Sequence, residues 1–369
     1  MLKVLYLLNH AGKAGTERYV QSLIEKLCVK SNRIKAYFAY NEEGLLAENL
    51  RAAGIETFRI VMRHPFDLRA VFELSRLCRR LEIDIIHTHY LRENYISLLS
   101  RLINPRVKVI YTNHFILKNN AVVRMFNRML SPLQAGVISV CSKGRDMLIA
   151  NGIDGRKIRV IFNGVDPDLW GQPCASTMRE EFGIGSGVFV LLCASRFAHD
   201  KGHKFLIDSI AELKKTEAGK FKCVLANDGP LLDECRRYAE SIGLGEDIIF
   251  TGFRRDIKNL IAGSDLYVNS SAHEALSFAI IEVLACGIPV IATNMGGNDD
   301  IINPETNCGL LVEYGDAKGL AQAIARLMHD AGLLRVFRDN ALKTVREKFN
   351  LDKTAEETYN LYLKSCSLA

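Results

Sequence analysis

Short runs of β-branched and aliphatic residues recur along this chain, and each is followed by a stretch with the periodicity of a helix. Ten such runs occur, at residues 3–8, 34–40, 84–89, 108–114 and 136–140, and then at 188–197, 221–228, 247–253, 265–271 and 288–294. Near-continuous apolar strands that alternate with helices are typical of parallel sheets covered on both faces. Because the pattern runs through twice, the sequence predicts an α/β protein with two doubly wound units.

The chain length agrees with two units, since 369 residues exceed what one ordinary hydrophobic core organises. Gly, Pro, Asp and Ser cluster in residues 163–176, which is typical of a linker. We therefore predict one domain over residues 1–168 and a second over 169–350, with a final helix over 351–369. In open α/β sheets ligands bind beyond the carboxyl ends of the strands, so we expect the site in a cleft between the two domains.

The composition is that of a soluble globular protein, with 48% hydrophobic and 24% charged residues. The longest apolar stretch, residues 276–292, is interrupted by Glu282, Gly287 and Pro289, so it is not predicted to be a transmembrane helix. Ten cysteines are scattered without CxxC pairs. This usage favours reduced thiols in a cytoplasmic protein over a disulfide framework or a zinc site.

Charge is distributed unevenly along the chain. Residues 1–170 contain 26 basic and 15 acidic residues, whereas the remainder contains 22 and 27. The excess concentrates in residues 101–150, which hold eight basic residues and one acidic residue, Asp146. Such a stretch indicates an acidic partner (phosphate, nucleic acid or anionic lipid) or simply a solvated basic surface. The lack of interleaved aromatic and basic residues argues against nucleic acid.

A helical pattern over residues 121–133 lies within the basic stretch. It is expected to place three polar residues on one face, Arg124, Asn127 and Arg128, against Val122, Val123, Met125, Phe126, Met129 and Leu130. This pattern fits an interfacial helix in peripheral contact with an anionic membrane, on its inner face for a cytoplasmic protein. It also fits a helix packed on its own domain. The net charge of the neighbourhood favours membrane contact.

Two glutamates, Glu274 and Glu282, stand in the otherwise apolar stretch HEALSFAIIE. If a helix begins near Ser277, Glu274 lies in the preceding loop and Glu282 within the helix. Were both helical, they would be about 80° and about 12 Å apart, which is too far for the paired carboxylates of a retaining glycosidase. Carboxylates accept hydrogen bonds from hydroxyl pairs, so the two could hold two ends of a sugar-containing ligand, or each could pair with a nearby cation.

Cations and glycines follow other predicted strands. Arg196 and Lys201 lie just before a predicted helix, where two positive charges and a helix N-terminus would bind a diphosphate. Gly15 precedes another helix, and neither the dinucleotide nor the Walker spacing is present there. Gly229 and the Gly252–Phe253 turn follow two further strands and would allow close approach of a nucleotide, or would serve as ordinary turns.

Two further patterns suggest metal sites less strongly. His87 and His89 form an HxH pair at a strand end. No carboxylate–cysteine set completes a metal site, so we expect one exposed and one buried histidine, or contacts with an acceptor. Asp166-Pro167-Asp168 mimics a metal-binding DxD sequence but is more typical of a turn in the linker.

In order along the chain, these segments resemble the retaining GT-B glycosyltransferases of family 4, whose E-x7-E signature is matched by Glu274 and Glu282. Further matches are AGKAGTERYV, DIIHTHY, YTNHF, VISVCSKG, VIFNGVD, ASRFAHDKG, NDGP, FTGF and ACGIPVIATNMGG, so the resemblance spans nearly the whole chain. It implies a GT-B fold, two Rossmann-like domains facing across a cleft. It also implies that the terminal helix crosses back onto the first domain, which would be the acceptor side.

The resemblance implies roles for the candidate residues. Arg196 and Lys201 would neutralise the donor diphosphate, Glu274 would hold sugar hydroxyls, and Glu282 would hold the ribose. The backbone of Ala275, Leu276, Ser277 and Phe278 would lie against sugar and phosphate, with Gly229 and Phe253 on the donor side. Gly15 would let its loop close over the phosphates, and His114 would lie near the reacting sugar. Three positions depart from the common pattern: Ala14, Asn227 and Ala275 stand where glycine is usual.

The activity implied is transfer of a hexose-type sugar from a nucleotide-sugar donor, UDP-linked by expectation, to a glycan or lipid-linked acceptor. Members of the family retain the anomeric configuration and use neither metal nor cofactor, and the leaving phosphate acts as the base. Two alternatives stay open at this point. One is a nucleotide-sugar epimerase on the same fold, and the other is a non-enzymatic adaptor that binds membrane or nucleic acid. The donor sugar, the base and the acceptor are not encoded in any readable pattern.

Overall fold

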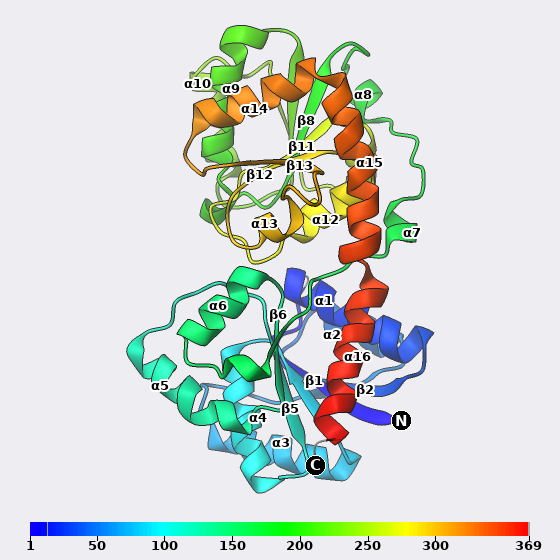
Figure 1. Cartoon of the computed structure of the whole chain (residues 1–369), viewed down its shortest axis with the longest axis vertical. Coiled ribbons are helices and arrows are strands. Elements are labelled where there is room, and N and C mark those ends of the chain that lie inside the picture. Colours follow the sequence, from blue (N-terminus) through cyan, green and yellow to red (C-terminus); the bar gives the residue numbers. More distant parts are fainter. Residues whose placement is uncertain (13, 368–369) are drawn as a thin grey trace. The chain divides into compact units, whose positions relative to one another are not determined.

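The computed structural model describes residues 1–12 and 14–367. The chain divides into two compact units, the first formed by residues 1–163 with 351–369 and the second by residues 164–350 (Figure 1). Each unit contains one parallel sheet flanked by helices, which confirms the predicted α/β class with two doubly wound units. The two units are described in turn.

In the described part of the first unit, seven parallel strands are arranged in the order β3-β2-β1-β4-β5-β6-β7. The strands are β1 (Leu2–His10), β2 (Ile34–Glu42), β3 (Glu56–Arg59), β4 (Ile85–Thr88), β5 (Lys108–Asn113), β6 (Gly136–Ser139) and β7 (Ile158–Val160). The helices are α1 (Gly15–Ile24), η1 (Glu25–Lys30), α2 (Leu45–Ala52), α3 (Leu68–Leu81), α4 (Leu91–Ile103), α5 (Ala121–Leu130), η2 (Ser131–Leu133), α6 (Ser142–Ala150), η3 (Gly155–Lys157) and α16 (Leu351–Ser367).

The described part of the second unit repeats this design with six parallel strands in the order β10-β9-β8-β11-β12-β13. The strands are β8 (Phe189–Ala194), β9 (Phe221–Ala226), β10 (Ile248–Gly252), β11 (Leu266–Asn269), β12 (Val290–Thr293) and β13 (Gly309–Val312). The helices are α7 (Pro167–Trp170), α8 (Met178–Glu181), η4 (His199–Lys201), α9 (His203–Glu217), α10 (Leu232–Ser241), α11 (Ile257–Ala262), α12 (Phe278–Ala285), α13 (Asn298–Ile301), α14 (Ala317–His329) and α15 (Ala331–Lys348).

The ten apolar runs all correspond to strands, but the sequence pattern missed β3, β7 and β13. All three lie at the edge of their sheets, and none is buried along its whole length. An edge strand is covered less completely than a central one, so it needs no continuous apolar run. A prediction based on such runs therefore finds the central strands first.

Strand order reverses at one place in each sheet, between β1 and β4 in the first unit and between β8 and β11 in the second. The loops that follow these two adjacent strands diverge to opposite faces of the sheet and leave a crevice, where ligands of doubly wound proteins bind. In the second unit the loops after β8 and β11 contain Lys201 and Glu274. The candidate residues thus lie where this topology places a ligand.

The terminal helix α16 packs within the first unit. Its Tyr362 hydroxyl lies 2.6 Å from Nδ1 of His87 and 3.2 Å from the Tyr6 hydroxyl. Nε2 of His87 lies 2.7 Å from Oγ1 of Thr112 on β5, so both ring nitrogens have partners. His87 and His89 are both fully buried, and the expectation that one would be exposed was wrong. These histidines belong to the core that joins α16 to the sheet.

Candidate active site

An ion pair joins two of the predicted site residues of the second unit. Nζ of Lys201 lies 2.8 Å from Oε1 of Glu274, and the two side chains are only 21% and 14% exposed. Asp200 adds a second carboxylate, 3.5 Å from the same ammonium. Burial acts to lower the pKa of Lys201, but the charges and hydrogen bonds of Glu274 and Asp200 raise it above its usual value overall. The ammonium therefore stays positive at every physiological pH.

The loop that contains Glu274 is held from several sides. Oγ of Ser271 donates a hydrogen bond of 2.9 Å to the Glu274 carboxylate. The backbone N–H of Gly297 donates to the carbonyl of Ala275 at 2.8 Å. Gly296 lies directly against the loop, because a Cβ added there would come 1.8 Å from the carbonyl oxygen of Glu274. The carboxylate is thus positioned by backbone contacts that no short sequence pattern reveals.

Lys201 is positioned in a similar way by a glycine. Gly202 has a φ of +64°, and a Cβ on it would lie 2.1 Å from the carbonyl oxygen of Ser270. The loop before α9 therefore fits closely against the loop after β11, and Oγ of Ser270 donates to the Lys201 carbonyl at 2.9 Å. No sequence pattern indicates that Gly202, Ser271 and Gly296 support these side chains. The one available signal was that both glycines lie close to predicted strand ends.

The helix that follows Glu274 begins where the sequence pattern placed it. Ser277 caps α12, its hydroxyl accepting from the N–H of Ile280 at 3.5 Å, and Phe278 is the first helical residue. Glu274 is therefore in the loop and Glu282 in the helix, where it is 5% exposed. Leu276 and Ser277 are also buried. The N-terminus of α12 is consequently adjacent in sequence to Glu274, an arrangement that favours bound anions.

Three residues predicted to lie on the donor side follow other strands of this sheet. Arg196 is exposed just after β8, and Phe253 is 52% exposed just after β10. Gly229 has a φ of +149° and fits against the backbone of Phe197, next to Arg196, so a Cβ there would lie 2.5 Å from a carbonyl oxygen. Asn227, which replaces the usual glycine, has a φ of +115°. Asparagine tolerates positive φ better than most residues, which explains how it occupies this turn.

His114 and Gly15 belong to the first unit. Gly15 is the first residue of α1 and is exposed. His114 follows β5, with its Nε2 3.1 Å from Nδ1 of His89 and its ring centre 5.0 Å from that of Tyr19. Loss of water around the ring lowers the pKa of His114 to about 3. At neutral pH this imidazole is uncharged and acts as a hydrogen-bonding group rather than a cation.

A carboxylate that the sequence analysis missed lies at the same edge of this sheet. Glu93, in the first turn of α4, is fully buried and accepts a hydrogen bond from the backbone N–H of Asn9 at the end of β1. Among the described residues, no partner reaches its second oxygen. Burial, opposed by these hydrogen bonds and by Arg92, raises the pKa of Glu93 to about 7. Single residues of this kind lack a sequence signature.

Glu93 predicts an unusual dependence of stability on pH. Its folded-state pKa lies above the ordinary value of 4.5, so the folded state binds the proton more tightly than the unfolded state. The stability that this proton adds is complete below pH 4.5 and is lost as pH rises through 7. We expect Glu93→Gln to remove this loss and to raise the free energy of unfolding at pH 8 by on the order of 2 kcal/mol. Urea unfolding at pH 5 and pH 8 measures the change, and an equal effect at both values would contradict it.

The described residues contain no group of three or more His, Cys, Asp or Glu side chains that could hold a metal ion. Asp166 instead caps the short helix α7 by accepting from the N–H groups of Asp168 and Leu169, as expected for a turn. All ten cysteines are free thiols. Among the helices within residues 1–12 and 14–367, none has the length and apolar character that crossing a bilayer requires.

Comparison with known families now supports what the fold and the ion pair suggest. The family described as "Glycosyl transferases group 1" matches residues 175–344, and the family described as "Glycosyltransferase Family 4" matches residues 14–169. Together the two matches cover most of both units. The chain belongs to the group 1 glycosyltransferases. The family resemblance read from the sequence is confirmed.

Individual relatives of this glycosyltransferase are distant but nearly full-length. N-acetyl-alpha-D-glucosaminyl L-malate synthase of Bacillus anthracis is 24% identical over 84% of this chain and 82% of its own. UDP-Gal:alpha-D-GlcNAc-diphosphoundecaprenol alpha-1,3-galactosyltransferase of Escherichia coli is 24% identical over 92% and 88%. The crystal structure of Anabaena Alr3699/HepE in complex with UDP matches with a TM-score of 0.86 at 22% identity, over 97% and 99%. This last likeness shows a shared fold.

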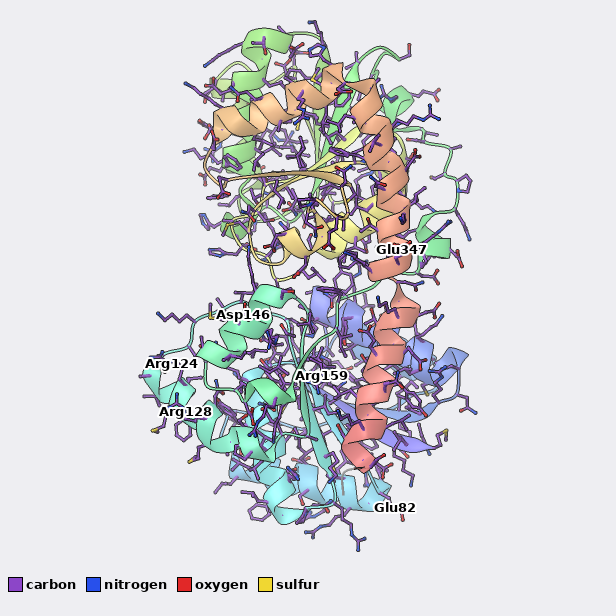
Figure 2. All side chains as sticks on the ribbon, viewed as in Figure 1. Glu82, Arg124, Arg128, Asp146, Arg159 and Glu347 are labelled. Carbon is purple, nitrogen blue, oxygen red and sulfur yellow. The ribbon has the colours of Figure 1, made fainter. Side chains whose placement is uncertain are left out.

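The structure corrects the predicted faces of α5. Asn127 is buried, not part of an exposed polar face with Arg124 and Arg128: its Oδ1 accepts from the Tyr95 hydroxyl at 2.6 Å. Three apolar side chains of the same helix are exposed instead, Val122 at 58%, Met125 at 59% and Met129 at 61%. The helix therefore presents apolar and basic side chains together, and Figure 2 shows Arg124 and Arg128 side by side on it.

Proposed function

We propose that this glycosyltransferase moves a hexose-type sugar from a UDP-linked donor to a glycan or lipid-linked acceptor, with retention of configuration and without a metal or other cofactor. The observation that carries the proposal is the partly buried Lys201–Glu274 pair at the point where strand order reverses in the second unit. An ammonium fixed just before the N-terminus of α9 suits a diphosphate, and the carboxylate paired with it, just before α12, suits sugar hydroxyls.

In this proposal the second unit binds the donor. Arg196 and Lys201 neutralise the diphosphate, Glu274 orients the transferred sugar, and Glu282 accepts hydrogen bonds from the ribose. Backbone groups from Ala275 to Phe278 approach the sugar and phosphate, while Gly229 and Phe253 border the nucleotide. The first unit, which contains Gly15 and the neutral His114, binds the acceptor. The leaving phosphate removes the proton of the attacking hydroxyl.

The UDP preference and the acceptor class are taken from relatives. Alr3699/HepE was crystallised with UDP, and the E. coli enzyme is named for a UDP-galactose donor and a diphosphoundecaprenol-linked acceptor. The B. anthracis enzyme is named for a malate acceptor, so the group includes small water-soluble acceptors as well. The lipid-linked alternative is favoured here by the basic and apolar surface of α5.

A panel of nucleoside diphosphates and nucleotide sugars tests the donor assignment by thermal shift. A ligand present at 100 times its Kd adds about 2.7 kcal/mol to the free energy of unfolding. We expect UDP and UDP-hexoses to raise Tm by several degrees, and GDP and ADP to have little effect. A larger shift with another base would contradict the UDP assignment. Product formed from the donor alone, with no acceptor present, would favour an epimerase.

The retaining outcome is tested separately from the donor. We expect the glycosidic proton of the product, observed by NMR early in the reaction, to have the anomeric configuration of the donor. Addition of EDTA is expected to leave the transfer rate unchanged within about twofold, because no bound metal takes part. An inverted product would contradict the proposed mechanism, and loss of activity in EDTA that is restored by a divalent cation would contradict the cofactor assignment.

We also propose that α5 contacts an anionic membrane surface through Val122, Met125 and Met129, with Arg124 and Arg128 meeting the headgroups. Apolar residues that enter the headgroup region next to cations are typical of peripheral helices. Flotation with anionic vesicles tests this contact. The double variant Met125→Ser/Met129→Ser is expected to reduce retention at low salt by at least tenfold. Equal retention of wild type and variant, or no retention of either, would contradict it.

A further inference from the structure

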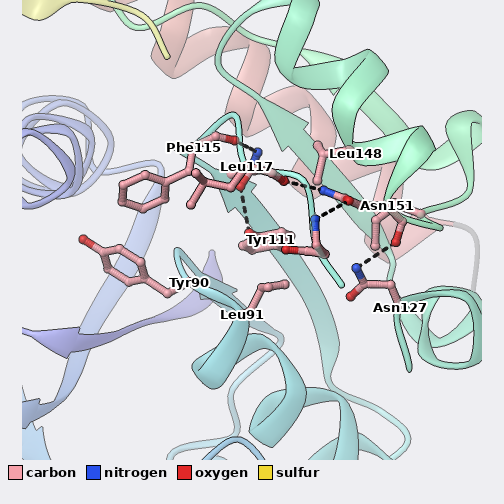
Figure 3. Close-up of a pocket in the computed structure, with 11 residues that line it drawn as sticks. Tyr90, Leu91, Tyr111, Phe115, Leu117, Asn127, Leu148 and Asn151 are labelled. Carbon is pink, nitrogen blue, oxygen red and sulfur yellow. Dashed lines mark hydrogen bonds between the residues drawn. The ribbon is translucent and has the colours of Figure 1, made fainter. Parts of the chain in front are cut away.

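A cavity of about 260 Å³ lies in the first unit, bordered by the loop after β5, the start of α4 and the turn after α6 (Figure 3). It is lined by Tyr90, Leu91, Tyr111, Asn113, Phe115, Leu117, Asn119, Asn127, Leu148, Asn151 and Ile153. None of the residues predicted as catalytic or donor-binding lines it. The cavity is therefore distinct from the donor site of the second unit, and its occupant has to be deduced from its walls.

Four asparagines line the cavity, but three of them use their amides to hold the loop in place. Asn151 donates to the carbonyl of Leu117 at 2.7 Å and accepts from the N–H of Asn119 at 2.9 Å. Asn127 in turn donates to the carbonyl of Asn151 at 2.9 Å. Figure 3 shows these bonds along one side of the cavity. These hydrogen bonds hold the loop after β5 in place, so that it forms one side of the cavity.

The other end of the loop is fixed in the same manner. Asn113 accepts from the Tyr111 hydroxyl at 2.9 Å and donates to the carbonyl of Phe115 at 2.6 Å. The ring of Phe115 lies 5.7 Å from that of Tyr90, centre to centre. Because these polar groups bond to one another, the cavity presents mainly aromatic and aliphatic surface to a ligand. A bare sugar would find few free hydrogen-bonding partners there, so the walls favour a hydrocarbon.

The loop that lines the cavity and the neighbouring helix α5 also contain exposed apolar and basic residues. Phe115 and Leu117 are 45% and 64% exposed although they line it. Lys118 is exposed and lies between two lining residues in the sequence. Helix α5, which contains Arg124, packs closely on the turn after α6: a Cβ on Gly152 would lie 2.7 Å from the Arg124 carbonyl oxygen. Asp154, the one acidic residue adjacent in sequence to a lining residue, pairs with Arg156 at 2.8 Å. An occupant with an anionic group next to an apolar chain matches this charge pattern.

We propose that this cavity holds the hydrocarbon chain of a lipid-linked acceptor, next to its phosphate, which lies by Lys118 and Arg124. The inference rests on the proposed function and specifies the acceptor. An apolar cavity of about 150 Å³ can hold a benzene ring, so the present volume suits a segment of roughly ten carbon atoms. The chain enters the first unit, and the remainder of the acceptor extends outward past Phe115 and Leu117.

Isothermal titration calorimetry with geranyl phosphate, a soluble ten-carbon prenyl phosphate, tests the site on the whole chain. Methyl phosphate is the probe without a hydrocarbon chain. We expect geranyl phosphate to bind at least 100-fold more tightly than methyl phosphate, since burial of each CH2 group is favourable. Equal affinity for the two probes would overturn the proposal, because the phosphate alone would then account for binding.

Two variants address the cavity and its opening. Leu148→Trp fills the space, and Leu117→Glu places a carboxylate at the exposed edge, where the fold tolerates it. Each is expected to weaken geranyl phosphate binding at least tenfold. Leu102→Trp, at a 59% exposed position of α4 outside the cavity lining, is the matched control and is expected to bind within twofold of wild type. Unchanged binding by Leu117→Glu, or by a folded Leu148→Trp, would overturn the proposal.

Two further measurements separate this inference from the proposed function. UDP binding by wild type and Leu117→Glu is expected to be equal, because the donor site lies in the other unit. UDP binding without geranyl phosphate binding would refute the cavity assignment and leave the proposed transfer intact. Geranyl phosphate binding without any UDP binding would refute the proposed transfer and, with it, the acceptor role of the cavity.

Discussion

Replacement of Glu274 by glutamine is expected to reduce the rate of sugar transfer by 100-fold or more, with little effect on folding. The carboxylate accepts from Lys201 at 2.8 Å and from Ser271 at 2.9 Å, and a neutral amide keeps the shape but loses the charge. A hundredfold loss corresponds to about 2.7 kcal/mol of transition-state stabilisation, within the range observed for single charged or polar contacts at active sites. Steady-state kinetics with a nucleotide-sugar donor measures it.

The matched control for this variant is Glu234→Gln, at an exposed position of α10, which is expected to keep the wild-type rate. Lys201→Ala is expected to lose activity and to weaken UDP binding, because the ammonium is assigned to the diphosphate and Glu274 to the sugar. Glu274→Gln should therefore bind UDP almost normally. Transfer rates within about threefold of wild type in both variants would mean that Lys201 and Glu274 form only a structural ion pair.

Gly296→Ala is expected to lower activity at least as strongly, although residue 296 has no assigned contact with substrate. Its added methyl group would lie 1.8 Å from the carbonyl oxygen of Glu274 and 2.6 Å from the carbonyl carbon, both backbone atoms. The loop must move to relieve the overlap, and the Glu274 carboxylate moves with it. A displacement of about 1 Å in a positioned group can reduce the rate on the order of 100-fold. Steady-state kinetics and thermal unfolding of the variant measure the two effects.

Gly315→Ala separates this displacement from backbone strain. Gly315 has a φ of +91° and Gly296 a φ of +59°, but nothing lies within 4 Å of a Cβ at Gly315. Both variants incur a conformational cost of roughly 1 to 2 kcal/mol in free energy of unfolding. We expect Gly315→Ala to lose stability while keeping its transfer rate, and Gly296→Ala to lose both. Similar transfer rates for the two variants would show that the loop position is unimportant.

The sequence was sufficient to predict the central strands, because a strand buried on both faces needs a continuous apolar run, as in β1 and β8. It was insufficient for three of the four edge strands, β3, β7 and β13, which are short and partly exposed, whereas the edge strand β10 was recognised. On α5 the pattern predicted an amphipathic helix correctly but assigned Asn127 to the wrong face. Because asparagine is a polar residue, the sequence pattern predicts that it is exposed. The hydrogen bond that Asn127 accepts from Tyr95 shows that it is an interior residue.

For the site, local sequence was sufficient to place Glu274 before a helix and Lys201 after a strand, because caps and strand ends depend on neighbouring residues. The meeting of these two residues, 73 positions apart, depends on the adjacency of β8 and β11, which follows from the strand order of the whole sheet. The contact of Gly296 with the Glu274 loop and the cavity lined by Phe115 likewise depend on segments that are distant in the sequence. The sequence alone determined the fold class and the chemical types present. Only the tertiary structure decided which of them touch, because close approach of backbones and closure of a cavity depend on residues distant in the chain.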